Sequence, residues 1–344
     1  MEQRVFEASA PGNIFFFGEY AAAYGKPAIC AAVDRRTYVE VKERNDTKVL
    51  VDSDSFGKGS SEIKGNTLVN KRFEASELST TFDFLEMLVP KLGIKKGLEL
   101  KISSKVPVNS GMSSSTALLC AAFKAVSSFA GKQIPPEKYF DYIYPMQVKV
   151  HGGRASGAEI ISSALGGFNR IQKIEAEGKT SLDWQQLGTH KFSIVVGNTR
   201  ISSPTSLSVK YHLPSLIARK KDFVFGIFDE MEEICKAAES AIAKNDEAKL
   251  GKLMNKNQEL LSSLGVSHPK LDDCIEEARK AGALGAKLSG SGWGGIMFAL
   301  AKEKDAGKVL KAIESTGVEA FKAEIGGRGV LSESSKASNN AEAK

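Results

Sequence analysis

Pro107-Val-Asn-Ser-Gly-Met-Ser-Ser-Ser-Thr-Ala-Leu-Leu-Cys-Ala-Ala, residues 107–122, runs from a proline and a glycine through three serines into an apolar helical pattern. A helix that begins near Ser114 leaves its first backbone N–H groups without intrahelical acceptors, and its dipole adds positive potential there. Gly111 permits close backbone approach, and the hydroxyls of Ser113, Ser114 and Ser115 suit phosphate oxygens or Mg²⁺. The stretch therefore predicts an anion cradle; the alternative is an ordinary serine N-cap before a buried helix.

Length, composition and charge limit the class of protein. With 344 residues the chain is long enough for a sizeable core, and its length suggests two domains. The apolar fraction of 42% and the charged fraction of 26% are ordinary for a globular protein. The net charge is +6, and the basic residues are scattered rather than gathered into a stripe. We therefore expect no nucleic-acid partner, whereas an anionic small-molecule substrate is compatible with this charge.

The cysteines and the N-terminal residues indicate the cellular compartment in which the protein is expected. Four cysteines stand far apart without CxxC spacing, each in an apolar pattern, and are predicted to be reduced core residues: Cys30, Cys120, Cys235 and Cys274. Charged residues occur among the first eight positions, and no uninterrupted apolar run approaches a membrane span. We therefore expect a cytoplasmic protein with no targeting segment and no membrane partner.

Periodicity and helix breakers predict a mixture of strands and helices. Alternation predicts a strand at 37–43, and composition predicts a surface loop over 52–67. A helix is expected from Ser79 to Val89, ended by Pro90, and an apolar buried helix from Ser115 to Ala130. Further expected elements are strands at 98–103, 168–173 and 192–196, helical faces between residues 223 and 261, and a helix at 269–282.

Composition along the chain predicts the domain organisation. Composition tolerates a boundary between residues 175 and 190, so we predict domains at residues 1–185 and 186–331. The segment from Ser332 to Lys344 is small, polar and without apolar periodicity. We expect it to be a disordered tail.

Two further glycine-bearing segments accompany the serine stretch. They are Ala10-Pro-Gly-Asn-Ile-Phe-Phe-Phe-Gly-Glu-Tyr at residues 10–20 and Lys287-Leu-Ser-Gly-Ser-Gly-Trp-Gly-Gly at residues 287–295. With residues 107–117, their order and spacing resemble the GHMP family of small-molecule kinases over about residues 5 to 330. Within that family, Tyr24-Gly-Lys-Pro-Ala and Leu264-Gly-Val-Ser-His-Pro resemble the members that phosphorylate mevalonate. We call the three segments motif 1, motif 2 and motif 3 in chain order.

The resemblance implies an α+β, two-domain GHMP kinase fold. Its N-terminal domain would be of the ribosomal protein S5 domain 2-like type and its C-terminal domain ferredoxin-like, with ATP in the cleft between them. The residues implied to hold ATP are Pro107, Asn109, Ser110, Gly111, Met112, Ser113, Ser114, Ser115 and Thr116. Ser114, Ser115 and Gln147 are the implied Mg²⁺ ligands. On the substrate side the resemblance implies Glu19, Tyr20, Ser289, Gly290, Ser291 and Gly292.

Three positions depart from the family pattern. Asn13 stands where many members have a lysine, Gln147 where they have a metal-binding glutamate, and Glu159, after Ser156-Gly-Ala, where they have the catalytic aspartate. In one interpretation Glu159 orients or deprotonates the acceptor hydroxyl and Asn13 hydrogen-bonds phosphate or substrate. In a second, no strong base is needed, because phosphoryl transfer asks mainly for positioning and charge stabilisation. In a third, the cleft binds a nucleotide or metabolite without turnover.

Two arginines and Ser156 lie in segments implied to face the acceptor. Arg154 precedes Ser156, and Arg200 occupies Asn198-Thr-Arg-Ile-Ser-Ser-Pro-Thr. Guanidinium groups suit bidentate recognition of carboxylate or phosphate. One arginine could bind the carboxylate of mevalonate. Two arginines would suit an acceptor that already carries a phosphate group. The alternative is that both are solvated surface charges.

The expected function is ATP- and Mg²⁺-dependent transfer of a γ-phosphoryl group to the 5-hydroxyl of mevalonate or mevalonate 3-phosphate. The alternatives are a phosphomevalonate kinase, a kinase for another small alcohol, and a catalytically silent regulator. A homodimer is compatible with the resemblance. Asn13, Glu19, Tyr20 and the glycines of motif 3 have an alternative interpretation as turn or buried polar residues. Lys287 is predicted to be structural, and no histidine pair has zinc-ligand spacing.

Overall fold

The computed structural model describes residues 4–107, 111–150, 155–201 and 207–333. Its strands are β1 Val5–Phe17, β2 Ala28–Glu43, β3 Lys48–Ser53, β4 Gly57–Lys64, β5 Thr67–Phe73, β6 Leu98–Ser104, β7 Phe168–Ala176, β8 Lys179–Gly188, β9 Phe192–Asn198, β10 Gly285–Ser289, β11 Ile296–Leu300, β12 Glu319–Ile325 and β13 Leu331–Glu333. Its helices are α1 Leu78–Leu92, α2 Ser114–Phe129, α3 Tyr139–Val150, α4 Ala158–Leu165, α6 Leu213–Ala243, α7 Glu247–Ser263, α8 Pro269–Lys280 and α9 Glu303–Ser315.

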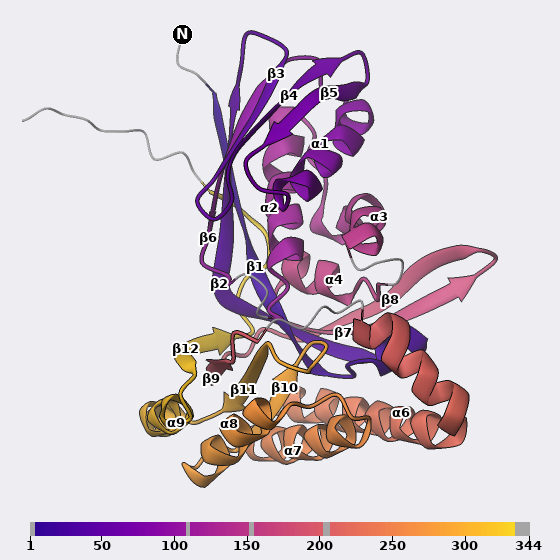
Figure 1. The fold of residues 1–344 in the computed structure, drawn as a ribbon, viewed down its shortest axis with the longest axis vertical. Coiled ribbons are helices and arrows are strands. Elements are labelled where there is room, and N and C mark those ends of the chain that lie inside the picture. Colours follow the sequence, from indigo (N-terminus) through magenta and orange to yellow (C-terminus); the bar gives the residue numbers. More distant parts are fainter. Residues whose placement is uncertain (1–3, 108–110, 151–154, 202–206, 334–344) are drawn as a thin grey trace, which may run out of the picture.

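The described strands form one continuous sheet. Its main path runs in the order β10-β11-β9-β12-β2-β6-β3-β4-β5, with β1, β7, β8 and β13 joined beside it. The long strand β2 pairs with β1, with β6 and, through its first residues, with β7. A single residue pair, Ile325 with Val33, joins β12 to β2. Strand β2 therefore links the two halves that Figure 1 shows one above the other.

The N-terminal half packs helices on one face of its strands. Helices α1 to α4 lie together on that face in Figure 1. Helix α2 is apolar on nearly every side, so it is buried against β1 and β2 and shares a core with α1 and α3. Phe84 and Phe123 are fully buried there, and burying each such side chain contributes about 1.5–3 kcal/mol. This packing fixes the start of α2, and with it motif 2, close to β1.

The C-terminal half has the predicted ferredoxin-like arrangement. In chain order, helices separate β9 from β10, a short loop joins β10 to β11, and α9 separates β11 from β12. The spatial order is β10-β11-β9-β12, with every neighbouring pair antiparallel. Helices α6 to α9 cover the outer side of this sheet (Figure 1). Its core also includes Ile14 and Phe16 of β1 and Ile29 of β2. The predicted α+β fold class is therefore confirmed.

Several sequence expectations are confirmed by the structure. Helix α2 begins at Ser114 and ends at Phe129, within one residue of the prediction, and strand β6 covers the predicted 98–103. All four cysteines are free and buried. The helix predicted at 269–282 is α8, and His268 caps it, because its Nδ1 accepts from the backbone N–H of Lys270 at 3.1 Å.

Other expectations need correction. Residues 52–67 are not a surface loop, because β3 extends to Ser53 and β4 pairs on both sides with β3 and β5. The polar composition concealed the inward-facing Ser61 and Ile63, which are buried. Helix α1 continues past Pro90 to Leu92, since a proline in the last turn removes only one intrahelical hydrogen bond.

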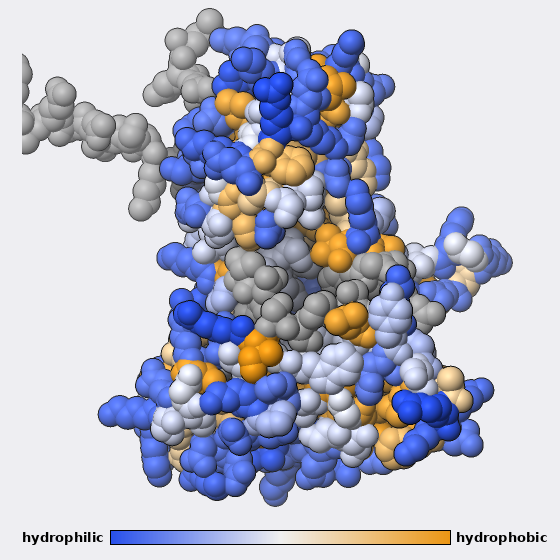
Figure 2. Space-filling model, in the orientation of Figure 1, coloured by the Kyte–Doolittle hydropathy of each residue, from blue (hydrophilic) through white to orange (hydrophobic). Residues whose placement is uncertain are grey.

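The ends of the predicted domains fall within regular structure. Residue 185 lies inside β8, and the division at that point stays a prediction. Residues 332 and 333 belong to β13, which pairs with β1, so ordered chain extends two residues into the predicted tail. Residues 334–344 lie outside the described part of the chain. The face of the molecule that Figure 2 shows is mainly hydrophilic, with scattered hydrophobic patches. No helix among the described residues is both long and apolar enough to cross a bilayer.

Candidate active site

Motif 2 forms the start of helix α2. Ser113 is the N-cap residue, with φ 54° and ψ 43°, and Gly111 also has a left-handed φ of 74°. Ser114 and Ser115 occupy the first helical positions and are half-buried. Met112 is fully buried beneath them. Free N–H groups and hydroxyls at a helix N-terminus form the arrangement expected for a phosphate site. The predicted ATP-contacting residues Asn109 and Ser110 lie outside the described residues.

Motif 1 lies directly against motif 2. The backbone N–H of Asn13 donates to the carbonyl of Met112 at 3.1 Å, and Ser113 Oγ donates to Asn13 Oδ1 at 3.1 Å. A Cβ atom on Gly12 would stand 2.8 Å from the Met112 carbonyl oxygen, so glycine is the residue that allows this approach. The Pro11-Gly12 part of β1, where the pairing with β2 shifts register, therefore fits tightly against motif 2.

Motif 3 approaches motif 2 from the C-terminal half. A Cβ atom on Gly111 would lie 3.1 Å from the Ser289 carbonyl oxygen, and one on Gly290 would lie 3.6 Å from the Gly111 Cα atom. Ser289 is buried, and its hydroxyl has no hydrogen-bond partner among the described residues. The three motifs, far apart in sequence, thus meet at the start of α2.

The predicted catalytic residues join the same cluster. Gln147 Nε2 donates to Glu159 Oε2 at 2.9 Å and to Thr116 Oγ1 at 3.3 Å. Asn13 Nδ2 donates to the Glu159 carbonyl at 3.2 Å and to Ser163 Oγ at 2.9 Å. All five residues are buried, and Glu159 keeps 8% of its surface exposed. Asn13, Gln147 and Glu159, the three departures from the family pattern, therefore belong to one hydrogen-bonded network.

The electrostatic setting of Glu159 comes from its helix. Glu159 lies in the first turn of α4, whose N-terminus carries positive potential that favours a carboxylate. Ser156 Oγ accepts from the backbone N–H of Ala158 at 3.2 Å and so supports the start of that helix. Within the described residues Glu159 forms no ion pair. Arg154, predicted beside it, lies outside the described part of the chain.

The predicted substrate residues fall into different settings. Glu19 is buried in an ion pair with Lys287, and the Tyr20 hydroxyl donates to the Ser291 carbonyl. Arg200 is exposed and donates through Nη2 to Glu319 Oε2 at 2.6 Å. The structure brings Glu19 and Tyr20 to motif 3, whereas the Arg200 side chain is held by a surface carboxylate.

Two residues of this region were missed by the sequence reasoning. Ser163 bridges Asn13 and the Pro11 carbonyl, to which it donates at 2.9 Å. Asn257 Nδ2 donates to Glu19 Oε2 at 3.2 Å. Asn257 interrupts an otherwise apolar helical face, which is a signal that a buried polar partner exists. Ser163 offered no comparable signal, because small polar residues are common in helix α4.

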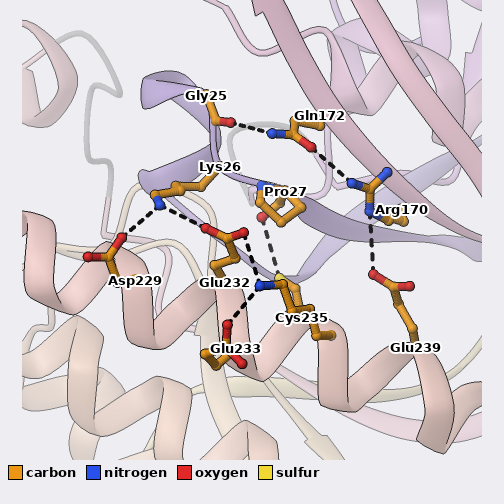
Figure 3. A network of polar contacts seen from close by, with 11 residues as sticks. Gly25, Lys26, Pro27, Arg170, Gln172, Asp229, Glu232, Glu233, Cys235 and Glu239 are labelled. Carbon is orange, nitrogen blue, oxygen red and sulfur yellow. Dashed lines mark hydrogen bonds and ion pairs between the residues drawn. The ribbon is translucent and has the colours of Figure 1, made fainter.

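The segment that follows motif 1 is anchored on helix α6 (Figure 3). Lys26 Nζ lies 2.7 Å from both Asp229 Oδ1 and Glu232 Oε2. Hydrogen bonds to these two carboxylates raise the pKa of Lys26. Cys235 Sγ, one turn further along the helix, donates to the Pro27 carbonyl at 3.4 Å. Partly exposed ion pairs of this kind each contribute little to stability.

The side chains that could bind a metal ion here are neutral oxygen donors rather than a cluster of charged residues. Among the described residues no group of three or more His, Cys, Asp or Glu side chains could hold an ion. Gln147 Oε1 is buried and has no hydrogen-bond partner among the described residues. The amide nitrogen of the same side chain donates to Glu159 and Thr116. That oxygen and the hydroxyls of Ser114 and Ser115 are the hard, neutral donors that suit Mg²⁺.

The comparisons with known proteins agree with this geometry. The profile for the GHMP kinases N terminal domain matches residues 79–167, and that for GHMP kinases C terminal matches residues 238–319. The chain belongs to the GHMP kinase family and is a small-molecule kinase.

The chain is also similar to individual proteins over nearly its whole length. A protein named mevalonate kinase from Thermococcus sibiricus is 34% identical over 90% of this chain and 93% of its own length. One of the same name from Pyrococcus furiosus is 34% identical over 94% of this chain and 97% of its own. The fold is shared with the crystal structure of L. major mevalonate kinase in complex with R-mevalonate. The TM-score is 0.77 at 21% identity, covering 94% of this chain and 96% of that one.

Proposed function

We propose that this kinase of the mevalonate pathway transfers the γ-phosphoryl group of ATP to the 5-hydroxyl of mevalonate or of mevalonate 3-phosphate. Relatives named mevalonate kinase match nearly the whole chain, which supports a mevalonate-type acceptor. The observation that carries the proposal is the meeting of the three motifs beside the Glu159 carboxylate. A phosphate seat and a carboxylate in one cluster are what phosphoryl transfer to an alcohol requires.

Glu159 is the residue that acts on the acceptor hydroxyl in this proposal. Its Oε2 is oriented by Gln147, so its other carboxylate oxygen remains available to accept a hydrogen bond from the acceptor. A carboxylate in that position aligns the hydroxyl with the γ-phosphorus and accepts its proton as the bond forms. Asn13 holds the backbone of Glu159 and the side chain of Ser113, and so fixes the carboxylate relative to the phosphate loop.

The phosphates of ATP would lie at the N-terminus of α2. Backbone N–H groups and the helix dipole there favour the negative charge that the leaving ADP acquires. Ser114, Ser115 and Gln147 Oε1 would hold Mg²⁺, which when bound neutralises charge on the phosphates. Gly290 and Gly292 of motif 3 give close backbone approach on the acceptor side.

An acceptor that already carries a 5-phosphate is the second prediction from the sequence. It rested on Arg154 and Arg200 acting together. Arg200 donates through Nε and Nη2 to Glu319, so one bidentate edge of its guanidinium already holds a carboxylate. Mevalonate 5-phosphate therefore enters the test as a competing acceptor rather than as a proposal.

The test is ADP release from ATP and Mg²⁺ with mevalonate, mevalonate 3-phosphate and mevalonate 5-phosphate as separate acceptors. We expect turnover with one of the first two. In the Glu159→Gln variant we expect kcat to fall about a hundredfold or more, the range for loss of a general base. The thermal midpoint should change little, because glutamine keeps the size of the side chain.

Glu99→Gln is the matched control, since Glu99 is a partly exposed carboxylate on β6 that lies beside Arg44. It should leave kcat unchanged. No ADP release with mevalonate or with mevalonate 3-phosphate, whatever the result with mevalonate 5-phosphate, would overturn the proposal. Unaltered kcat in Glu159→Gln would overturn the role given to that carboxylate and favour catalysis by positioning alone.

A further inference from the structure

The turn at the end of motif 1 holds two adjacent side chains that both reach motif 3. Strand β1 ends at Phe17, and Glu19 and Tyr20 follow before the short 3-10 helix Ala21–Tyr24. Tyr20 has φ 65° and ψ −51°, a conformation that is strained for an aromatic residue. Such strain persists only where surrounding contacts determine the conformation, and both side chains are buried.

Glu19 forms the first of these contacts, a fully buried ion pair. Lys287 Nζ donates to Glu19 Oε1 and, at 2.7 Å, to the carbonyl of Leu288. Lys287 has no exposed surface and Glu19 has 2%. Asn257 Nδ2 donates to the second carboxylate oxygen at 3.2 Å, so both oxygens of Glu19 are engaged. Burial lowers the pKa of Lys287, against the opposing effect of the Glu19 carboxylate.

Tyr20 forms the second contact, at the tip of motif 3. Its hydroxyl donates to the carbonyl of Ser291. Burial raises the pKa of this phenol well above its ordinary value, so the hydroxyl remains a donor. Glu19 therefore reaches the start of motif 3, in strand β10, and Tyr20 reaches the loop of the same motif at Ser291.

Buried ion pairs are weak sources of net stability, because desolvation offsets their attraction. Their directional hydrogen bonds, by contrast, determine where two segments lie relative to one another. The segment placed here is the loop whose Ser289 carbonyl lies against Gly111 of the phosphate loop. Lys287 lies two residues before that carbonyl and Ser291 two residues after it.

We propose that Glu19 and Lys287 are a positioning pair which, with Tyr20, fixes the motif 3 loop against the phosphate loop during phosphoryl transfer. The inference rests on the proposed function for its kinetic consequence. Neither residue touches the reacting atoms in this proposal. They act through the backbone of residues 288–291, and a small displacement there misplaces the groups that face the acceptor.

The test replaces the buried polar set by apolar side chains of similar size: Glu19→Leu, Asn257→Leu and Lys287→Met together. Trp293, which lies in motif 3 and donates to the Gly265 carbonyl at 2.8 Å, reports the loop by its fluorescence. Trp184→Phe removes the other tryptophan from the background. We expect an equal or higher thermal midpoint. We also expect kcat lower by about tenfold to a hundredfold, and stronger acrylamide quenching of Trp293.

Tyr20→Phe is the second variant, because it removes one hydroxyl and keeps the ring. It should fold, increase the quenching of Trp293 and lower kcat, even if the triple variant fails to fold. Lys26→Met is the matched control: it breaks an ion pair from the same segment to α6, at a surface away from motif 3. Its kcat and Trp293 quenching should equal those of the parent.

Two results would overturn the inference. One is a folded triple variant with parental kcat and parental quenching of Trp293, which would make the pair a dispensable core feature. The other is a folded Tyr20→Phe variant in which both quantities are unchanged. The fluorescence measurement needs no acceptor, so its outcome is independent of whether mevalonate is the substrate.

Discussion

Gln147, which the resemblance implied as a Mg²⁺ ligand with Ser114 and Ser115, also hydrogen-bonds the Glu159 carboxylate. Its amide nitrogen donates to Glu159 at 2.9 Å and to Thr116 at 3.3 Å, while its buried amide oxygen has no hydrogen-bond partner among the described residues. One neutral side chain thus connects the proposed carboxylate, the phosphate-binding helix and the proposed Mg²⁺ position. A glutamate there would bring a second negative charge within hydrogen-bond distance of Glu159, which disfavours ionisation of both.

Gln147→Leu tests this role at the scale of one residue. The variant removes the side-chain donor to Glu159 among the described residues and leaves a group of similar volume. We expect kcat to fall about tenfold to a hundredfold, because the carboxylate loses its orientation. Steady-state kinetics and a thermal melt measure the two effects. Gln185→Leu, on the exposed strand β8, should leave kcat unchanged. A Gln147→Leu variant with parental kcat would contradict the assignment.

At the scale of elements, the ends of helices determine where loops begin. Gly93 caps the C-terminus of helix α1, and its φ of 69° lets its N–H donate to the Val89 carbonyl. Helix α9 has Gly307 in its interior instead. A Cβ atom at either glycine would meet no other atom within 4 Å, so sterics do not distinguish the two positions. Only the backbone conformation differs.

Alanine at these two glycines should therefore have opposite effects. We expect Gly93→Ala to lower the free energy of unfolding by about 1 kcal/mol, because alanine is strained at that φ. We expect Gly307→Ala to raise it by about 0.5–1 kcal/mol, since alanine is the better helix former. Urea unfolding of the two variants measures both values. If both variants changed the free energy of unfolding in the same direction, local backbone conformation would not determine the effect of alanine at these positions.

The elements also show what the sequence could predict. Helix α2 was predicted within one residue, because its apolar pattern and serine cap are local signals. Strand β4 was missed, since its polar residues are paired by neighbouring strands that composition does not reveal. Hydrogen-bond partners in the network of Asn13, Gln147 and Glu159 lie up to 150 residues apart in the sequence. Glu19 and Lys287 lie 268 residues apart. Motif resemblance could name these residues, but only the fold determines which side chains meet.

At the scale of the whole molecule, the two halves share structure. The core of the C-terminal half takes Ile14, Phe16 and Ile29 from β1 and β2. Strand β2 continues into the N-terminal sheet, where Val39 and Val41 belong to the other core. Removing either half would expose apolar surface of the other, at about 25 cal/mol for each Å².

We therefore expect the chain to unfold as one cooperative unit. Trp184 lies on β8 beside the N-terminal half, and Trp293 lies in motif 3. Fluorescence of the single-tryptophan variants Trp184→Phe and Trp293→Phe should give the same urea midpoint after correction for the stability of each variant. Circular dichroism on both provides the reference signal. Two separated midpoints in one variant would indicate independently folding halves.

The shared strand β2 has a practical consequence for dissecting the enzyme by gene truncation. The segments matched by the two family profiles, residues 79–167 and 238–319, both exclude β1 and β2. A polypeptide cut at those limits would lack the strands that close either core, and its exposed edges would invite aggregation. Recombinant pieces should therefore retain residues 5–43 whichever half is sought, and mixing separately expressed halves is a poor route to active enzyme.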